Sequence, residues 1–346
     1  EYAYDNVGNR VGETTTVPGS PGPLDDKQGV FDTLNRLTEL NDLLDPAKNE
    51  TFDWDDNGNQ IGRTVGSGPG AVTTEFVYDV RDKLTEVEQG AATPARFQYD
   101  FEGRRNLKIG DATLRQYVYD ETSLFAEYDL GGSQTLKYDY GSDRLISLTH
   151  HVEGRRYFSL DGLRSVVNLT DDLGGTVASY HLDAWGNFRF PNELDDSRNR
   201  FAFTGHYYDE ETKLYNAKAR YFDPELGRFL SQDSVLGTVD DPPSLHRYAY
   251  AKNRPTFFID PDGREPVTIG TVALLVVLGA EIGFFTDFIA QSFESAGFLT
   301  KDFDPKRSAL STGAGGLSAG AGVAVGAVGL GTVGATGTAI LIDSGL

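Results

Sequence analysis

The chain has 346 residues, of which 39% are hydrophobic and 12% aromatic, enough to build a core and to exclude wholesale disorder. Its formal net charge of −21, with lysines and arginines spread singly, argues against a nucleic-acid binder, because a phosphate backbone needs a concentrated basic face. The absence of cysteine excludes disulfides and thiol catalysis, and with only five histidines we expect no metal and no cofactor. The opening EYAYDNVGNR has no initiator Met and no signal peptide, so we expect residue 1 to lie inside a longer protein.

An aromatic–aspartate pair recurs along the first half of the chain at an irregular spacing of about twenty residues. In each unit an alternating apolar and polar run precedes a turn of Asp, Asn or Gly, and a second alternating run follows. This pattern predicts β-hairpins, which must stack into one sheet because a single hairpin cannot bury its apolar face. The units are YDNVGNR (4–10), FDTLNRLTEL (31–40), WDDNGNQ (54–60), YDVRDKLTEV (78–87), YDFEGRR (99–105), YDETS (119–123), YDYGSDRLISL (138–148) and LDAWGNFR (182–189).

The paired residues have structural roles in this interpretation. Successive side chains of a strand point to opposite faces, so the aromatic ring packs between strands while the Asp accepts hydrogen bonds from turn amides. We therefore expect Tyr78, Tyr99, Tyr119 and Tyr138 to be packed. Up to residue 260 we expect strands and turns, with helix confined to short pieces in the second half.

The strings after the repeats are more specific. They are YFSLDGLRSVVNLTDDLGGTVASYHLDAWGN (157–187), FTGHYYDEETKLYNAKARYFDPELGRFLSQD (203–233), YAYAKNRP (248–255) and DPDG (260–263). Over residues 1–263 the chain closely resembles the RHS/YD-repeat proteins and their RHS-associated core domain. The resemblance implies a mainly β fold: an antiparallel β-strip that spirals into a hollow shell, with the core domain as a plug. The parts would be an N-terminally truncated strip (1–156), the core domain (157–263) and a glycine-rich, apolar, helical pre-toxin segment (264–346).

Shells of this family enclose the polypeptide that follows them, typically a toxin. The resemblance thus implies an encapsulating and delivery module for a C-terminal toxin, secreted or on the surface of a bacterium. Its partners would be its own C-terminal cargo segment, an immunity protein and a secretion machine. The alternative from another class is an extracellular structural or adhesive YD-repeat protein. A complete DPxG junction followed by an unrelated apolar tail favours delivery.

Family members often cut themselves at this junction by an aspartyl-protease-like reaction. Arg220, Asp233 and Asp260 match the family's functional positions. Two carboxylates that share a proton can supply a base and an acid, and a nearby Arg keeps one of them ionised.

The junction itself is Gly263, Arg264 and Glu265, and it departs from the family pattern. The resemblance implies a cut one residue beyond the Gly, usually after a Leu. The usual Leu is Arg264 here, so the cut would fall after DPDGR, and the usual SQDP is SQDS, with Ser234. The DPDG string is also a natural turn, and Asp233 could brace the plug. The residues therefore leave open whether the site cuts or is only a plug.

Two apolar stretches follow the junction. Residues 267–285 have the length of a bilayer span, although they contain Glu281, and residues 313–342 carry small residues at helix-packing spacing. A helical hairpin is predicted, and membrane contact through both stretches is one interpretation. The others are a shell-enclosed cargo leader and an apolar filler of the shell. No catalytic motif of a toxin is visible in the tail.

Overall fold

The computed structural model describes residues 1–92, 94–110, 114–141, 144–190 and 198–268. Nearly all of them belong to one compact unit, Glu1–Asp139 with Leu145–Ile269. The second unit, Tyr140–Arg144 with Gly270–Leu346, lies almost wholly outside the described residues, as do both apolar stretches beyond residue 268. The fold below is that of the first unit.

One antiparallel sheet of 17 strands makes up the described chain from residue 2 to residue 179. Strands that follow one another in the sequence pair side by side, so the sheet is a continuous meander. The predicted mainly β strip is confirmed. Its strands are β1 (Tyr2–Tyr4), β2 (Arg10–Thr15), β3 (Asp25–Phe31), β4 (Leu37–Asp42), β5 (Glu50–Trp54), β6 (Gln60–Val65), β7 (Val72–Tyr78), β8 (Leu84–Gln89), β9 (Ala95–Tyr99), β10 (Arg105–Ile109), β11 (Leu114–Asp120), β12 (Ser123–Tyr128), β13 (Gln134–Tyr140), β14 (Leu145–His150), β15 (Gly154–Leu160), β16 (Val166–Thr170) and β17 (Thr176–Ser179).

Most of the repeat aspartates hold the hairpin turns. In the turn between β3 and β4, Asp32 Oδ1 accepts hydrogen bonds from the backbone N–H groups of Leu34 and Arg36, at 2.9 and 3.0 Å. Asn35 takes a left-handed φ of 62°, which an Asn or Gly tolerates best. The same hydrogen bond, from the backbone N–H of the residue four positions later to Asp Oδ1, recurs at Asp5, Asp55, Asp79, Asp100, Asp129, Asp161, Asp171 and Asp183.

The four tyrosines expected to be packed are at least half-buried, whereas Tyr4 of the first repeat unit is exposed. Tyr138 is buried, and Tyr78, Tyr99 and Tyr119 are half-buried. The Tyr99 hydroxyl donates to the Leu84 carbonyl at 2.6 Å, which ties the end of β9 to the start of β8. Asp139 differs from the aspartates that hold turns. It lies inside β13, and its side chain accepts a hydrogen bond from the Ser147 hydroxyl.

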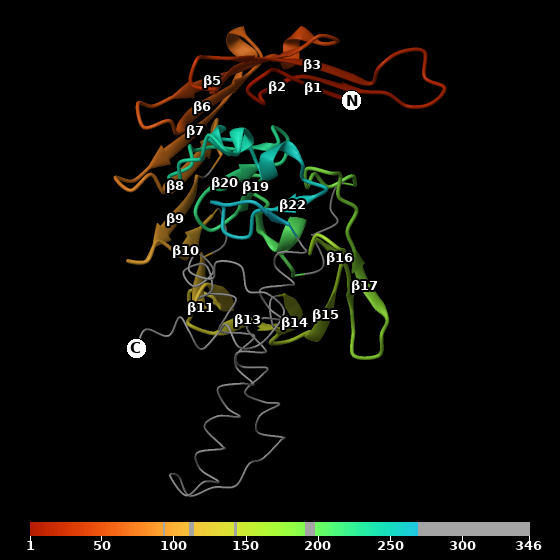
Figure 1. The fold of residues 1–346 in the computed structure, drawn as a ribbon. Coiled ribbons are helices and arrows are strands. Elements are labelled where there is room, and N and C mark those ends of the chain that lie inside the picture. The colour runs from red at the N-terminus through yellow and green to blue at the C-terminus, as the bar shows by residue number, and fades with distance from the viewer. Residues whose placement is uncertain (93, 111–113, 142–143, 191–197, 269–346) are drawn as a thin grey trace, which may run out of the picture. The chain divides into compact units, whose positions relative to one another are not determined.

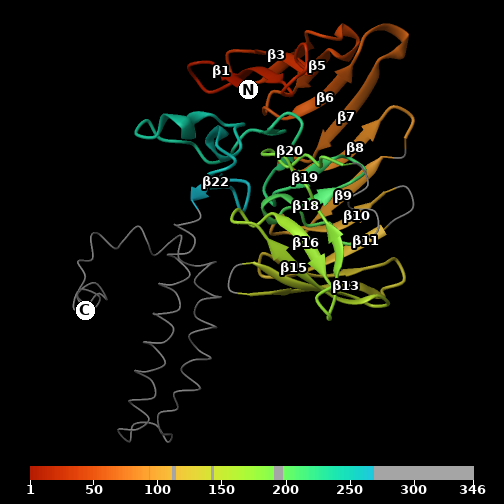
Figure 2. The ribbon, with the colours of Figure 1, turned by 90° about the vertical axis from the view of Figure 1, so that its right-hand side faces the viewer.

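The core segment, residues 180–263, packs against the strip (Figures 1 and 2). Its small sheet consists of β18 (Tyr207–Asp209), β19 (Leu214–Asn216), β20 (Tyr221–Asp223) and β21 (Arg228–Phe229). Three 3₁₀ turns accompany it: η3 (Phe203–Gly205), η4 (Pro242–Leu245) and η5 (Ala251–Asn253). Its apolar centre comprises Trp185, Ala202, Phe203, Tyr215, Ala217, Phe222, Phe229, Tyr250 and Ala251.

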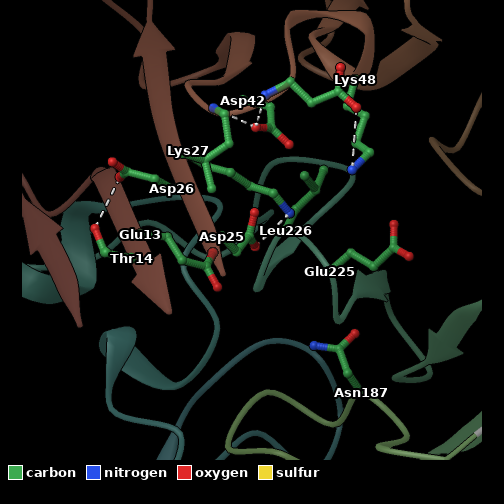
Figure 3. Close-up of polar contacts among 12 residues, drawn as sticks. Glu13, Thr14, Asp25, Asp26, Lys27, Asp42, Lys48, Asn187, Glu225 and Leu226 are labelled. Atoms are coloured by element: carbon green, nitrogen blue, oxygen red, sulfur yellow. Dashed lines mark hydrogen bonds and ion pairs between the residues drawn. The ribbon is translucent and has the colours of Figure 1, made fainter. Parts of the chain in front are cut away.

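Contacts between the core segment and the strip extend from β2 to β16. Arg10 on β2 donates to the Leu226 carbonyl at 2.6 Å, and the N–H of Val166 on β16 donates to the Ala202 carbonyl at 3.0 Å. Figure 3 shows the region of β2, where the Thr14 hydroxyl donates to Asp26 at 3.0 Å within the strip. Figure 1 shows the strip curving around the core segment.

Three local features differ from the sequence-based expectations. Two 3₁₀ turns, η1 (Pro46–Lys48) and η2 (Gly68–Gly70), lie between strip strands, where no helix was expected; each contains a proline that fixes φ near a helical value. Residues 157–179, assigned from the sequence to the core domain, form parts of β15, β16 and β17 of the strip.

The third difference lies at the start of the first apolar stretch. Val267–Thr268 form a short strand, β23, which pairs with β22 (Phe258–Ile259), where a helix was predicted. Backbone pairing with an existing strand satisfies these residues' polar groups locally. Among the described residues, no helix combines the length and apolarity that a membrane crossing requires.

Candidate functional site

The structure brings the three predicted residues together from three places in the core segment. Arg220 precedes β20, Asp233 follows β21, and Asp260 directly follows β22. Arg220 Nη2 lies 2.7 Å from Asp233 Oδ2 and 3.6 Å from Asp260 Oδ2. Arg220 and Asp260 are buried, and the Asp233 side chain is 13% exposed. One buried guanidinium thus contacts both carboxylates.

The rest of the Arg220 guanidinium is fixed by backbone and ring contacts. Its Nε donates to the Gly263 carbonyl at 2.6 Å, and its Nη1 donates to the Arg247 carbonyl at 2.9 Å. Its Cζ lies 3.7 Å from the centre of the Phe229 ring, a cation–π contact. Because every nitrogen of the group has a partner, the guanidinium is held in one orientation toward the junction.

The junction is a tight turn closed by Asp260. Asp260 Oδ1 accepts a hydrogen bond from the backbone N–H of Arg264 at 2.9 Å. Gly263 is buried and has a φ of +72°, and a Cβ there would lie 2.5 Å from the Ala217 carbonyl oxygen. Only glycine fits this position without moving the backbone.

This turn has the same form as the turns of the strip. In the turn between β9 and β10, Asp100 Oδ1 accepts from the backbone N–H of Arg104 at 2.9 Å, and Gly103 has a φ of +79°. The two strings are DFEGR (100–104) and DPDGR (260–264). The junction is therefore a repeat-type turn placed inside the core segment.

The two turns differ in electrostatics. At Asp100, burial opposes ionisation, but hydrogen bonds from Arg104 outweigh it and lower the pKa of the carboxyl. At Asp260, burial raises the pKa to about 6, even though Arg220 opposes the shift. Burial also raises the pKa of Asp233, against the same Arg220 charge. Two carboxyls with raised pKa values that share one guanidinium are the components of acid–base chemistry on a peptide bond.

Sequence reasoning missed Arg247, which braces Asp233. The Arg247 guanidinium donates to the Asp233 carbonyl through both Nε and Nη2, and the Asp233 N–H donates back to the Arg247 carbonyl at 2.9 Å. Nothing in the local sequence singles out this arginine among the scattered basic residues.

Arg264 and Glu265 are exposed, so the structure places Arg264 in solvent and not in a pocket shaped for Leu.

No group of three or more His, Asp or Glu side chains in the described part of the chain is arranged to hold a metal ion.

Residues 1–256 match the family model described as Teneurin YD-shell. The chain belongs to the YD-shell family. The match spans both the strip and most of the core segment, and it ends just before the DPDG turn.

Relatives of this YD-shell protein include a protein named as a tRNA nuclease and one named as a toxin. It is 36% identical over 270 residues to the tRNA3(Ser)-specific nuclease WapA of Bacillus spizizenii, covering 76% of this chain and 11% of that protein. It is 30% identical over 335 residues to the Toxin protein Tse5 of Pseudomonas aeruginosa, covering 81% of this chain and 24% of that protein. The chain thus spans about a tenth to a quarter of these relatives' lengths.

A solved structure, the crystal structure of TcdB2-TccC3-Cdc42, aligns with a TM-score of 0.44 and 18% sequence identity. The alignment covers 76% of this chain and 17% of that one.

Proposed function

We propose that this YD-shell chain is part of a bacterial encapsulation and delivery module that encloses the polypeptide following it and cuts the chain at the DPDG junction. Family membership and toxin-named relatives support the shell role. The observation that carries the cutting role is the buried Arg220 held between Asp233, Asp260 and the Gly263 carbonyl.

The roles in the proposed cut follow from the contacts. Asp233, with the shorter contact to Arg220, stays ionised more readily and takes a proton from the attacking water. Asp260, which closes the junction turn through the Arg264 N–H, supplies the proton to the leaving group. Arg220, in contact with both carboxylates, keeps one of them ionised. Arg247 positions Asp233 through its backbone.

The wider proposal keeps the division into strip (1–156), core domain (157–263) and pre-toxin segment (264–346), with the strands of the large sheet from residue 157 to residue 179 counted in the core domain. The partner is the chain's own C-terminal cargo, with an immunity protein and a secretion machine in a secreted or surface setting. Enclosure is tested by protease treatment of the folded protein without detergent. We expect residues 267–342 to resist digestion under conditions that cleave an exposed loop, and their rapid loss would contradict enclosure.

Cutting is tested by intact-mass measurement of the purified chain. We expect two fragments in the wild type and a single full-length species for both Asp233→Asn and Asp260→Asn, because an amide neither activates water nor donates the proton. The matched control is Asp100→Asn, which alters the equivalent turn of the strip and should leave cutting intact. A single uncut species in the wild type would mean that the site is only a structural plug.

A further inference from the structure

Arg228, on β21, is a buried cation that lacks a hydrogen-bond acceptor. The residue is 6% exposed, and its Nη2 donates to the Asn35 carbonyl at 2.7 Å. Its Nε is buried and has no hydrogen-bond partner in the described part of the chain. An unpaired N–H on a buried charged group is costly, so the guanidinium is short of an acceptor.

The carboxylates that influence Arg228 are engaged elsewhere. Asp32 Oδ2 pairs with Arg36 Nε at 2.6 Å, and Asp223 Oδ2 lies 3.4 Å from Arg63 Nη1. Burial lowers the pKa of Arg228 to about 9, so the group is still a cation at neutral pH. Within the described residues, this buried positive charge therefore has no counter-ion of its own.

Three aromatic rings surround the guanidinium without neutralising it. The Arg228 Cζ lies 5.2 Å from the centre of the Phe31 ring, 5.1 Å from that of Tyr248 and 6.0 Å from that of Trp54. A ring face attracts a cation but carries no net charge. The rings thus hold the side chain in place and leave its charge uncompensated.

Arg228 also lines a cavity of about 30 Å³ between the first two hairpins of the strip and the core segment. One water-sized group needs about 10–15 Å³, so the space suits a small ion. The second charged side chain in the wall is Arg10, which lies 3.6 Å from Glu13, and no aspartate or glutamate of the described residues lines the cavity. In a chain with 52 acidic and 31 basic residues, a cavity with two arginines and no carboxylate favours a negative ligand.

The neutral polar side chains of the cavity wall are already bonded to one another or to the backbone. His246 Nε2 bonds Asn9 Oδ1 at 2.9 Å, and Asn253 Nδ2 donates to the Gly8 carbonyl at 2.6 Å. Burial lowers the pKa of His246 to about 4, so its ring is neutral at neutral pH. The unmet need in the wall is therefore that of Arg228.

We propose that a small monovalent anion of the chloride class binds in this cavity and accepts a hydrogen bond from Arg228 Nε. Water fits this need less well, because it adds no negative charge and its own protons require acceptors. The bound ion joins the first two hairpins of the strip to the core segment. It is independent of the proposed cut, since Arg220, Asp233 and Asp260 do not line the cavity.

The test is urea denaturation of full-length Asp233→Asn, a variant expected to stay in one piece. Sodium chloride replaces sodium gluconate, whose anion is too large for the cavity, at constant ionic strength. A ligand that binds only the folded chain raises the ratio of folded to unfolded protein, about elevenfold at ten times its dissociation constant. We expect stability to rise with chloride and to saturate, and equal stability in the two salts would overturn the proposal.

Two further substitutions separate a bound ion from a general salt effect. Arg228→Gln removes the charge and should abolish the dependence on chloride. The matched control, Arg96→Gln, removes an exposed arginine of the strip that pairs with Glu86, and it should keep the full dependence. An equal chloride dependence in Arg228→Gln would overturn the proposal.

A direct measurement does not require the Arg228 variant to fold. Crystals of Asp233→Asn grown in sodium bromide should show an anomalous scattering peak within hydrogen-bond distance of Arg228 Nε. A water molecule there without anomalous signal, or an empty cavity, would overturn the proposal.

Discussion

Asp100 and Asp260 open turns of the same form, yet one carboxyl is held ionised and the other holds its proton to about pH 6. The difference comes from surroundings: Asp100 faces its own Arg104, whereas Asp260 is 1% exposed and shares Arg220 with Asp233. Both turns have an Asp Oδ1 that accepts from the N–H four residues on and a glycine of positive φ, so what packs on each turn accounts for the difference in pKa.

This difference predicts a pH dependence of cutting. Asp260 must be protonated to act as the acid, and its pKa is raised to about 6 by burial. Above that value the protonated fraction falls about tenfold per pH unit, and the rate should fall with it. The measurement is fragment formation after refolding uncut protein from denaturant between pH 5 and pH 9. A rate independent of pH from 6 to 8 would exclude Asp260 as the acid.

The same raised pKa predicts a stability cost of the site. A carboxyl whose folded pKa lies above its unfolded value stabilises the fold below the unfolded pKa, and this contribution is lost as pH rises through about 6. The comparison is between two uncut proteins, Asp233→Asn alone and Asp233→Asn combined with Asp260→Asn. The free energy of unfolding of the double variant, relative to that of Asp233→Asn alone, should therefore rise between pH 4 and pH 8. The shift from 3.8 to about 6 corresponds to roughly 3 kcal/mol. Denaturant midpoints that differ equally at both pH values would contradict this.

The sequence identified the three site residues only through family resemblance, and their geometry was beyond it. Arg220, Asp233 and Asp260 are separated by loops whose path depends on packing inside the core segment. The role of Arg247 depends on backbone contacts to Asp233, which no residue pattern encodes. The exposed position of Arg264 likewise follows from the turn's placement and cannot be read from the string DPDGR.

At the scale of elements, β10 and β18 are joined by a buried ionic cluster. Arg105 Nη1 and Lys108 Nζ both bond the Asp209 carboxylate, the latter at 2.8 Å, and all three side chains are at most 3% exposed. Arg105 Nη1 also donates to the Tyr221 hydroxyl at 3.0 Å. The cluster fixes the register of the core segment against the strip, because a shift of either would leave buried charges unpaired.

Asp209→Asn should accordingly destabilise the fold by about 3–5 kcal/mol, since it leaves the buried Arg105 without its counter-ion and Lys108 with only the partly exposed Glu211. The control is Glu86→Gln, which removes the more exposed pair with Arg96 and should cost no more than about 1 kcal/mol. Chemical denaturation of both variants measures the difference. Equal, small losses would show that the cluster contributes little.

The alternating pattern predicted the strands well because most strip strands have one face toward packed side chains and one toward solvent. It is uninformative where a neighbouring strand decides the local structure. Val267–Thr268 join β22 because a partner strand is present there, which an apolar run cannot indicate.

At the scale of the described unit, a meander of hairpins would by itself resemble a linear repeat array, in which distant parts unfold separately. The core segment counters this, because it contacts strands from β2 to β16. The two tryptophans lie on either side of this contact: Trp54 ends β5, and Trp185 belongs to the apolar centre of the core segment.

We therefore expect the unit to unfold in one step. Trp54→Phe and Trp185→Phe each leave a single fluorescent reporter, one in the strip and one in the core segment. Their denaturation curves should have the same midpoint after correction for each variant's stability by circular dichroism. Midpoints that separate would show that the strip and the core segment are independent folding units.

The pairing of β22 with β23 bears on what happens after a cut. Within the described residues two pairs, Phe258 with Thr268 and Ile259 with Val267, join these strands, and the pairs span the proposed break, with β22 upstream of it and β23 downstream. The hydrogen bonds of so short a pairing can break one after another, so a steady force on the downstream chain meets no large barrier there. Cleavage of the peptide bond and dissociation of the downstream fragment would then be separate steps. The rate of the first depends on proton transfer, and the rate of the second depends on the force applied to the fragment.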